Sequence, residues 1–530
     1  MANQPAAGEI NPEINPEINP EINPWIIAIS VMLSTFMEVL DTTVVNVSLP
    51  HIAGSLSASV DEATWALTSY LVANAIILPI TGWLANQLGR KRLLMLAVSG
   101  FTTASFLCGL APTLSLLIIF RVLQGACGGA LQPISQAVLL ESFPPEDRGK
   151  AMAFWGLGIV VAPMLGPVLG GWLTDSYSWR WVFYINVPVG IASLVMTQLF
   201  IFDPPYIRRS SQRIDYWGIG MLAIGVACLQ VVLDKGQEAD WFAAHWITAL
   251  AVTAFVALTA LVIYELKTPH PVLDLRVFLV RTYSTGVFLM AVLGVVLYGS
   301  LVILPIMLQT LLGYPALQAG IALFPRGLGS FLAMPIVGAM MTRLDPRKLL
   351  MGGILGGSAS LFLLGSLNLS VGYWDIFWPQ FLQGVSLACL FVPLTTITMD
   401  PIRREAMGNA TSIFNLMRNL GGSVGIAGVT TLVARHQQTN LNNLSGDVSA
   451  GSVRVQALVQ AFRSWFMFRG ANAVTATRRA YDAMWGMVRQ QAAMLSFNQV
   501  FWLLGILFLL MLPLVFLMRR PARRGQIAAH

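Results

Sequence analysis

Long apolar runs separated by short polar or basic loops recur along almost the whole chain. Most runs reach the roughly 20 residues that a helix needs to cross the hydrocarbon core of a membrane. The pattern therefore predicts an all-α polytopic membrane protein. Turn residues and charges place fourteen spans at residues 25–49, 63–86, 93–111, 114–136, 150–173, 180–202, 215–233, 244–264, 283–308, 317–341, 348–368, 374–397, 408–433 and 497–518.

The composition excludes a soluble globular protein. Only 11% of the 530 residues are charged and 56% are hydrophobic, whereas soluble proteins carry about 25% charged residues. The net charge of +7 would suit a nucleic-acid-binding protein, but the basic residues are concentrated in alternate loops between the spans. We therefore expect a lipid bilayer around the chain and no nucleic-acid partner.

The distribution of Lys and Arg predicts the orientation, because cytoplasmic loops carry the excess of these residues. If the N-terminus is cytoplasmic, the cytoplasmic loops and the C-terminal tail hold twenty Lys and Arg residues. The short external loops then hold two, Arg180 and Lys235. We predict that both termini are cytoplasmic.

Parts of the sequence repeat weakly at an offset of 256–259 residues. GWLANQLGRKRLLM at 82–95 aligns without gaps with GAMMTRLDPRKLLM at 338–351, and RVLQG at 121–125 aligns with QFLQG at 380–384. The shift of eight spans equals one six-span half plus two extra spans. The predicted domains are a disordered tail at 1–24, a six-helix half at 25–202, two inserted helices with a cytoplasmic linker at 203–264, a second six-helix half at 265–518 and a basic tail at 519–530.

The second half contains an external segment, 434–496, that is too long for a simple connector. Within it, VRVQALVQAFRSWFMF at 453–468 has apolar residues at helical spacing with arginines between them, which predicts an amphipathic helix. The segment either covers the outer mouth of the molecule or contacts another protein.

Two acidic residues, Glu38 and Asp41, lie inside the first span and share one helix face. Asp41 is about 24 Å into the span, so snorkelling to the external water is one explanation. The other is function, because acids inside spans are costly, usually face a cavity and often relay protons. A carboxyl group removed from water also takes up a proton more readily. We favour Asp41 as the proton carrier and Glu38 as a helper or substrate contact.

Three arginines also lie inside predicted spans, and a guanidinium there needs a carboxylate or carbonyl partner. For Arg121, Asp41 is a candidate partner and backbone carbonyls are the alternative. Arg326 has no obvious acid and either faces a substrate path or reaches a loop. Arg418 is a second candidate for the substrate path.

Four motifs resemble, in chain order, the signatures of fourteen-span drug:proton antiporters of the major facilitator superfamily, in particular the EmrB/QacA subfamily. They are LDTTVVNVSLP at 40–50, GWLANQLGRKR at 82–92, RVLQG at 121–125 and GIVVAPMLGPVLGG at 158–171. The resemblance covers residues 25–518 and implies the major facilitator fold of two six-helix halves, here with two inserted helices. It also implies a bacterial inner-membrane location.

The loop at 82–92 resembles a gate that locks the two halves together on the cytoplasmic side. The resemblance implies close helix contact at a first glycine, a turn at a second, and anchoring by two basic residues. The usual Asp is an Asn here, which can still cap a helix but cannot form the charged part of the lock. The matched residues are Gly82, Asn86, Gly89, Arg90 and Lys91.

The motif of the fourth span comprises Arg121, Gln124 and Gly125, and the resemblance associates its arginine with proton transfer. In the fifth span, small residues at every fourth position form a smooth stripe that lets helices approach closely, with two prolines beside it that bend the helix. The stripe resembles the antiporter motif and indicates export. Its residues are Gly158, Ala162, Pro163, Gly166, Pro167, Gly170 and Gly171.

Together these features predict a proton-coupled multidrug efflux transporter that exports hydrophobic or amphipathic compounds by alternating access. It would be the inner-membrane permease of a tripartite system with a periplasmic adaptor protein and an outer-membrane channel. The sequence holds no GxxxxGK[ST] loop for ATP, and we expect no cofactor, metal or catalytic residue. A dedicated exporter of one metabolite, such as a fatty acid or siderophore, is the alternative. A membrane sensor or enzyme is a remote one.

Overall fold

The computed structural model describes residues 23–203, 215–268, 271–448 and 452–518. The predicted tails at 1–24 and 519–530 lie almost entirely outside these ranges, as does most of the linker before the seventh predicted span. The described chain is a bundle of long helices, and its first half comprises α1 (Pro24–Ser55), α2 (Val60–Ala63), α3 (Trp65–Leu88), α4 (Arg90–Leu110), α5 (Leu114–Gly128), α6 (Leu131–Ser142), α7 (Arg148–Ser176), α8 (Trp181–Tyr184) and α9 (Asn186–Phe200).

Two further helices separate this half from the second one. They are α10 (Tyr216–Lys235) and α11 (His245–Lys267). The second half comprises α12 (Arg281–Ile306), α13 (Ala316–Ile321), α14 (Phe324–Met340), α15 (Pro346–Leu364), α16 (Tyr373–Met399), α17 (Met407–Asp447), α18 (Val453–Phe468) and α19 (Ala473–Val515).

Thirteen helical segments of the described chain are long and apolar enough to cross a membrane. They correspond to every predicted span except the one at 408–433, which lies within α17. That helix packs along α12 inside the bundle, but its buried Asn415 and Arg418 make it more polar than the others. The predicted multi-span helical architecture is confirmed, and α17 supplies the remaining helix.

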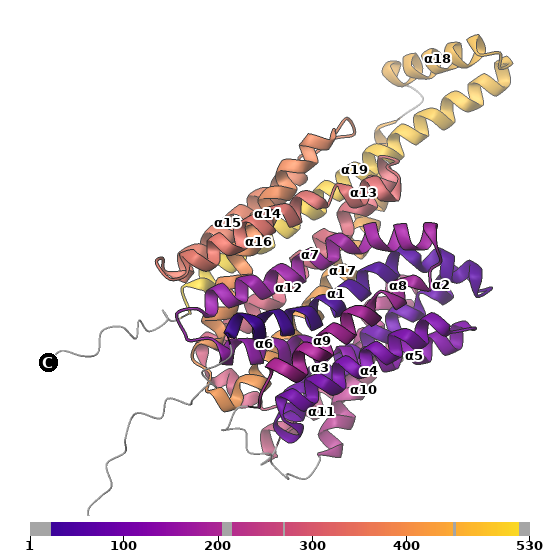
Figure 1. Cartoon of the computed structure of the whole chain (residues 1–530). Coiled ribbons are helices and arrows are strands. Elements are labelled where there is room, and N and C mark those ends of the chain that lie inside the picture. The colour runs from indigo at the N-terminus through magenta and orange to yellow at the C-terminus, as the bar shows by residue number, and fades with distance from the viewer. Residues whose placement is uncertain (1–22, 204–214, 269–270, 449–451, 519–530) are drawn as a thin grey trace, which may run out of the picture.

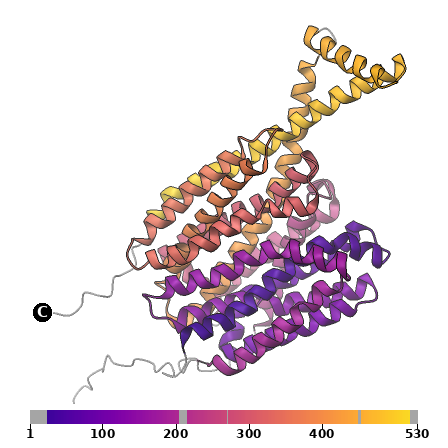
Figure 2. The same cartoon turned by 45° about the horizontal axis from the view of Figure 1, so that its top comes forward.

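The two halves lie side by side, the first in indigo to magenta and the second from pink and coral through orange to yellow (Figures 1 and 2). We call the end of the bundle where α1 begins and where α4, α7 and α15 start the basic end, because Arg90, Arg148 and Arg347 lie there. The inserted helix α10 packs against α3 and also touches α17. It therefore contacts both halves.

At the basic end, each half contacts the other through a glycine. The two glycines are aligned with each other in the sequence repeat. A Cβ atom at Gly82 of α3 would lie 2.6 Å from the backbone nitrogen of Asn409, at the start of α17. A Cβ atom at Gly338 of α14 would lie 2.9 Å from the Cβ atom of Ala153, near the start of α7. Only glycine permits such backbone contact, so both repeats close the basic end in the same way.

At the opposite end, α17 and α19 continue beyond the bundle and carry α18 (Figures 1 and 2). The helix α18 spans the residues predicted to be amphipathic and packs on α19. We call α18 and the parts of α17 and α19 that leave the bundle the hairpin. It projects away from the bundle (Figures 1 and 2), which favours the second of the two alternatives, a contact with another protein.

We expect a larger side chain at Gly421 to separate α12 from α17, because its Cβ atom would collide with the carbonyl oxygen of Ala291. Gly421→Val should lower the free energy of unfolding by about 1–3 kcal/mol, the usual cost of overpacking. Gly428→Val is the matched control, since it lies on the same helix with nothing within 4 Å of its Cβ position. Thermal unfolding in detergent measures both, and an equal loss in the two variants would contradict the proposed packing.

Candidate functional site

The centre of the first half contains a buried ion pair between α1 and α5. The Arg121 guanidinium donates from Nη1 to Oδ2 of Asp41 at 2.6 Å, and neither side chain is exposed. Two side-chain amides donate hydrogen bonds to the other oxygen of this carboxylate, Oδ1. Gln124 donates from Nε2 at 2.9 Å, and Asn186 donates from Nδ2 at 2.7 Å. Asp41 therefore accepts hydrogen bonds from helices α5 and α9.

The guanidinium of Arg121 also has partners that do not depend on Asp41. Its Nε donates to the carbonyl oxygen of Ala66 at 3.0 Å, and its Nη1 donates to Oε1 of Gln124 at 2.8 Å. The ring of Tyr70 lies 4.1 Å from the guanidinium carbon, within the range of a cation–π interaction. These contacts can hold Arg121 in place when the carboxyl group of Asp41 is neutral.

Glu38 is the start of a polar chain that connects the two halves. It lies one turn nearer the basic end than Asp41 and accepts from Nδ2 of Asn74 at 3.1 Å. Gln132 of α6 donates to the other carboxylate oxygen, and the oxygen of the same Gln132 amide accepts from Arg418 of α17. The side-chain amide of Gln132 therefore bridges Glu38 of the first half and Arg418 of the second half.

A second amide pair reinforces this connection. Asn415, one helical turn before Arg418, donates from Nδ2 to Oε1 of Gln136 in α6 at 2.5 Å. All of these side chains are buried. The contact between α6 and α17 is therefore polar at the centre of the interface.

The small-residue stripe of α7 packs on α1, the helix that carries both acids. Side chains at three of its glycines would collide with α1 or approach it within 2.8 Å, and Ala162 is fully buried. Nothing lies within 4 Å of the Cβ position of Gly171. The predicted stripe thus seats α1 against α7, through the pairs Gly158 with Met32, Gly166 with Thr43 and Gly170 with Val44.

The loop at 82–92 anchors the first half internally. Buried Arg90 pairs with Glu141 of α6 at 2.6 Å, and Lys91 donates from Nζ to the carbonyl oxygen of Gln198 in α9 at 2.6 Å. The left-handed φ of +87° at Gly89 starts α4. Its backbone approaches Asp203, which accepts from the backbone N–H of Lys91 at 2.8 Å.

Asn86 does not take the capping role that the sequence left open to it. Its side chain is exposed, and the carboxylate of Asp203 instead caps the start of α4. The contact between halves at this loop comes from Gly82 and its backbone neighbour Asn409.

The third predicted cation, Arg326, lies in the other half, away from the ion pair. It donates to Gln380 from Nε at 3.1 Å, and from Nη2 to Ser300 at 3.2 Å and to Gln383. The structure therefore groups Asp41, Arg121 and Gln124, puts Glu38 beside Arg418, and leaves Arg326 separate.

Sequence reasoning missed the uncharged partners of these groups. Asn74, Gln132, Asn186 and the ring of Tyr70 all touch the acids or Arg121. The sequence did contain a signal for these residues, because polar amides within apolar spans are costly and therefore mark sites that need hydrogen bonds. The sequence alone did not show which charge each amide faces.

Comparisons with known proteins identify relatives along nearly the whole chain. The sequence profile of the Major Facilitator Superfamily matches residues 31–426. The multidrug export protein EmrB of Escherichia coli (strain K12) is 36% identical over 501 residues, which cover 94% of this chain and 96% of that protein. The fatty acid resistance protein FarB of Neisseria gonorrhoeae is 35% identical over 501 residues, covering 94% and 97%.

Among solved structures, a double Trp mutant of XylE matches with a TM-score of 0.62 at 15% identity, covering 94% of this chain and 97% of that one. At this identity the likeness concerns the fold alone. It confirms the expected arrangement of helices, and the matches to EmrB and the superfamily profile confirm the resemblance seen in the motifs.

We expect Arg121→Met to destabilise the protein strongly, because it leaves the carboxylate of Asp41 buried without a counter-charge. The expected loss is about 3–5 kcal/mol. The double variant Asp41→Asn, Arg121→Met removes both charges and should recover a large part of that loss. Denaturant titration of the purified protein in detergent measures the cycle, and strictly additive losses would show that the two groups do not interact.

Proposed function

This chain belongs to the Major Facilitator Superfamily, and on that premise we propose that it is a proton-coupled multidrug exporter of the EmrB type. Family membership makes it a multi-pass membrane transporter and not an enzyme. The buried pair of Asp41 and Arg121 carries the proposal, because it places a titratable group inside the membrane domain beside a cation that has other partners.

The proposed proton carrier is Asp41. In the described structure its carboxylate is held by Arg121, Gln124 and Asn186 and is closed to solvent. Uptake of a proton weakens the bond to Arg121, which keeps Ala66 and Gln124 as acceptors. Both protonation states therefore have a set of hydrogen bonds, and opening to either side of the membrane decides whether the proton enters or leaves.

The hydrogen-bonded side chains of Glu38, Gln132 and Arg418 are the proposed link between protonation and rocking of the halves. Glu38 and Asp41 share one face of α1, so a shift of α1 that accompanies proton uptake also moves Glu38. Its hydrogen bonds to Gln132 would then change, and with them the contact to Arg418 in the other half. In this scheme Glu38 assists and Asp41 carries the proton.

The proton gradient is the proposed energy source, and each charge crossing 100 mV contributes about 2.3 kcal/mol. We place the chain in a bacterial inner membrane with both termini and the basic end in the cytoplasm, following the Lys and Arg asymmetry. The described contacts of Gly82 and Gly338 then close the cytoplasmic side.

Export of one compound class is the second candidate, and the similarity to FarB favours a fatty acid among such compounds. The proton site and the link between halves would serve either function. A substrate panel of unrelated hydrophobic cations, neutral drugs and fatty acids distinguishes a multidrug exporter from a dedicated one.

The hairpin is the proposed contact for a periplasmic adaptor protein, which would lead to an outer-membrane channel. It extends beyond the bundle (Figure 2) and exposes Val453, Phe468 and Val474, each at least 80% accessible. An open groove of about 430 Å³ lies between α18 and α19, lined by Arg463, Ala473, Val474, Thr477, Arg478 and Tyr481. Exposed apolar groups beside arginines suit an apolar and acidic partner surface.

We expect Asp41→Asn to abolish proton-driven transport, because an amide cannot release and take up a proton. In proteoliposomes with an imposed pH gradient, transport of a fluorescent hydrophobic cation should fall at least about 10-fold. Exchange of the same compound without a gradient should persist. Asp61→Asn changes an exposed acid in the same way and should leave transport intact; full gradient-driven activity of Asp41→Asn would remove Asp41 from the mechanism.

We expect the double variant Phe468→Ser, Val474→Ser to weaken adaptor binding, since it removes two exposed apolar side chains of the hairpin. Binding is measured by pull-down of a purified periplasmic adaptor protein. Leu279→Ser is the control, because Leu279 is equally exposed but lies at the basic end. Unchanged adaptor binding by the hairpin variant would refute the contact, and transport in proteoliposomes should be normal in both variants.

A further inference from the structure

The second half contains a buried cation whose charge is not balanced by any acid among the described residues. The side chain of Arg326 is 4% exposed, and its hydrogen-bond acceptors are the neutral groups of Ser300, Gln380 and Gln383. Its Nη1 atom is buried and has no partner within the described chain. An uncompensated charge in a low-dielectric interior is strongly unfavourable, so this site lacks a component.

The sequence repeat shows what is missing. Extending the alignment of 82–95 with 338–351 pairs Tyr70 with Arg326, and the motifs at 121–125 and 380–384 pair Arg121 with Gln380. The packing agrees with this alignment: a side chain at Gly125 would collide with the carbonyl oxygen of Tyr70, and one at Gly384 would collide with that of Arg326. Arg326 and Tyr70 therefore occupy equivalent places in the two halves.

The two sites differ in their charges. In the first half, α5 supplies the cation and α1 supplies the carboxylate of Asp41. In the second half, α14 supplies the cation, and the first helix of that half, α12, presents the hydroxyl of Ser300 at 3.2 Å from Nη2 of Arg326. The second site thus keeps a guanidinium and the glutamine equivalent to Gln124, which is Gln383, but it has Gln380 in place of Arg121 and a neutral group in place of the acid.

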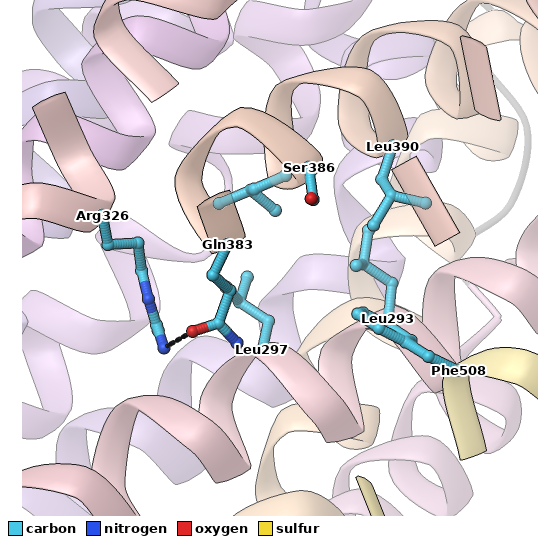
Figure 3. A pocket seen from close by; sticks show the side chains of 8 residues that line it. Leu293, Leu297, Arg326, Gln383, Ser386, Leu390 and Phe508 are labelled. Carbon is cyan, nitrogen blue, oxygen red and sulfur yellow. Dashed lines mark hydrogen bonds between the residues drawn. The ribbon is translucent and has the colours of Figure 1, made fainter. Parts of the chain in front are cut away.

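Beside Arg326 lies a small cavity with a mainly apolar wall (Figure 3). Its volume is about 10 Å³, which is the space of roughly one water-sized species. Arg326, Gln383 and Ser386 form its polar side. The Nε2 of Gln383 donates one N–H to Ser300 and keeps a second N–H, whereas the hydroxyl of Ser386 donates to the carbonyl oxygen of Leu382. The remaining wall is formed by Leu293, Leu297, Leu387, Leu390 and Phe508.

We propose that Arg326 and Gln383 form a binding site for a small monovalent anionic group, which replaces the missing carboxylate of the second half. A single guanidinium balances one negative charge, and a cavity of about 10 Å³ has room for one atom-sized group, such as a chloride ion or one oxygen of a carboxylate. The group comes either from a free anion or from the head of an amphiphile whose chain lies outside this cavity. The site does not depend on which compounds the transporter exports.

The test is the thermal stability of the purified full chain in a neutral detergent, with sodium gluconate replaced by sodium chloride, acetate or octanoate at constant ionic strength. A ligand that binds only the folded protein raises Tm in a saturable way, and we expect a rise of about 2–4 °C. A response to chloride or acetate indicates a free anion, and a response to octanoate alone indicates the head of an amphiphile. No response to any of the three overturns the proposal.

Two variants assign the response to Arg326. Arg326→Gln should abolish it, and Arg180→Gln, which removes an arginine charge outside the site, should retain it. Ser300→Asp supplies an internal carboxylate, so it should raise Tm in gluconate and lose the response to added anions. This variant also keeps the proposal testable if Arg326→Gln fails to fold. A full anion response in either Arg326→Gln or Ser300→Asp would overturn the proposal.

Discussion

The ion pair of Asp41 and Arg121 determines how the first half can be built. A charge in the hydrocarbon interior must meet an opposite charge or a full set of hydrogen bonds, since no water is available there. Asp41 meets this condition with donors from α5 and α9, and Arg121 with a carbonyl of α3. These helices must converge on α1, and the stripe of small residues on α7 lets a further helix close against it. The signature of the first span and the antiporter stripe are thus parts of one packing arrangement.

The second half repeats the helix arrangement of the first half but surrounds its buried cation differently. Its cation comes from α14 and is surrounded by the neutral side chains of Ser300, Gln380 and Gln383. This is the charge state that the first site would reach when Asp41 takes up a proton. The two described sites therefore differ in composition: the first pairs its arginine with a carboxylate, and the second surrounds its arginine with neutral groups.

The contact between the halves combines close backbone packing with a polar centre. Apolar contacts between helices gain little over contacts with lipid, so association in the membrane relies on small residues and hydrogen bonds. Gly82 and Gly338 provide the small residues, and Gln132 with Arg418 provides a hydrogen bond. Because Gln132 also donates to Glu38, this hydrogen bond between the halves is joined to an acid on the same helix face as Asp41. This arrangement is the basis of the coupling proposed above between protonation and the relative position of the halves.

The sequence by itself determined the membrane class, the span positions, the duplicated halves and the helix at 453–468, because hydropathy, span length and helical periodicity are local properties. It also indicated Asp41, Arg121 and the small stripe through motifs. Only the tertiary structure decided that Asp203 and not Asn86 caps α4, that Gln132 joins Glu38 to Arg418, and that the hairpin leaves the bundle. The reason is physical: partners such as Asp41 and Arg121, 80 residues apart, meet only when the rotation and crossing of several helices are fixed together. A sequence shows which polar groups require a partner in the membrane, and packing chooses the partner.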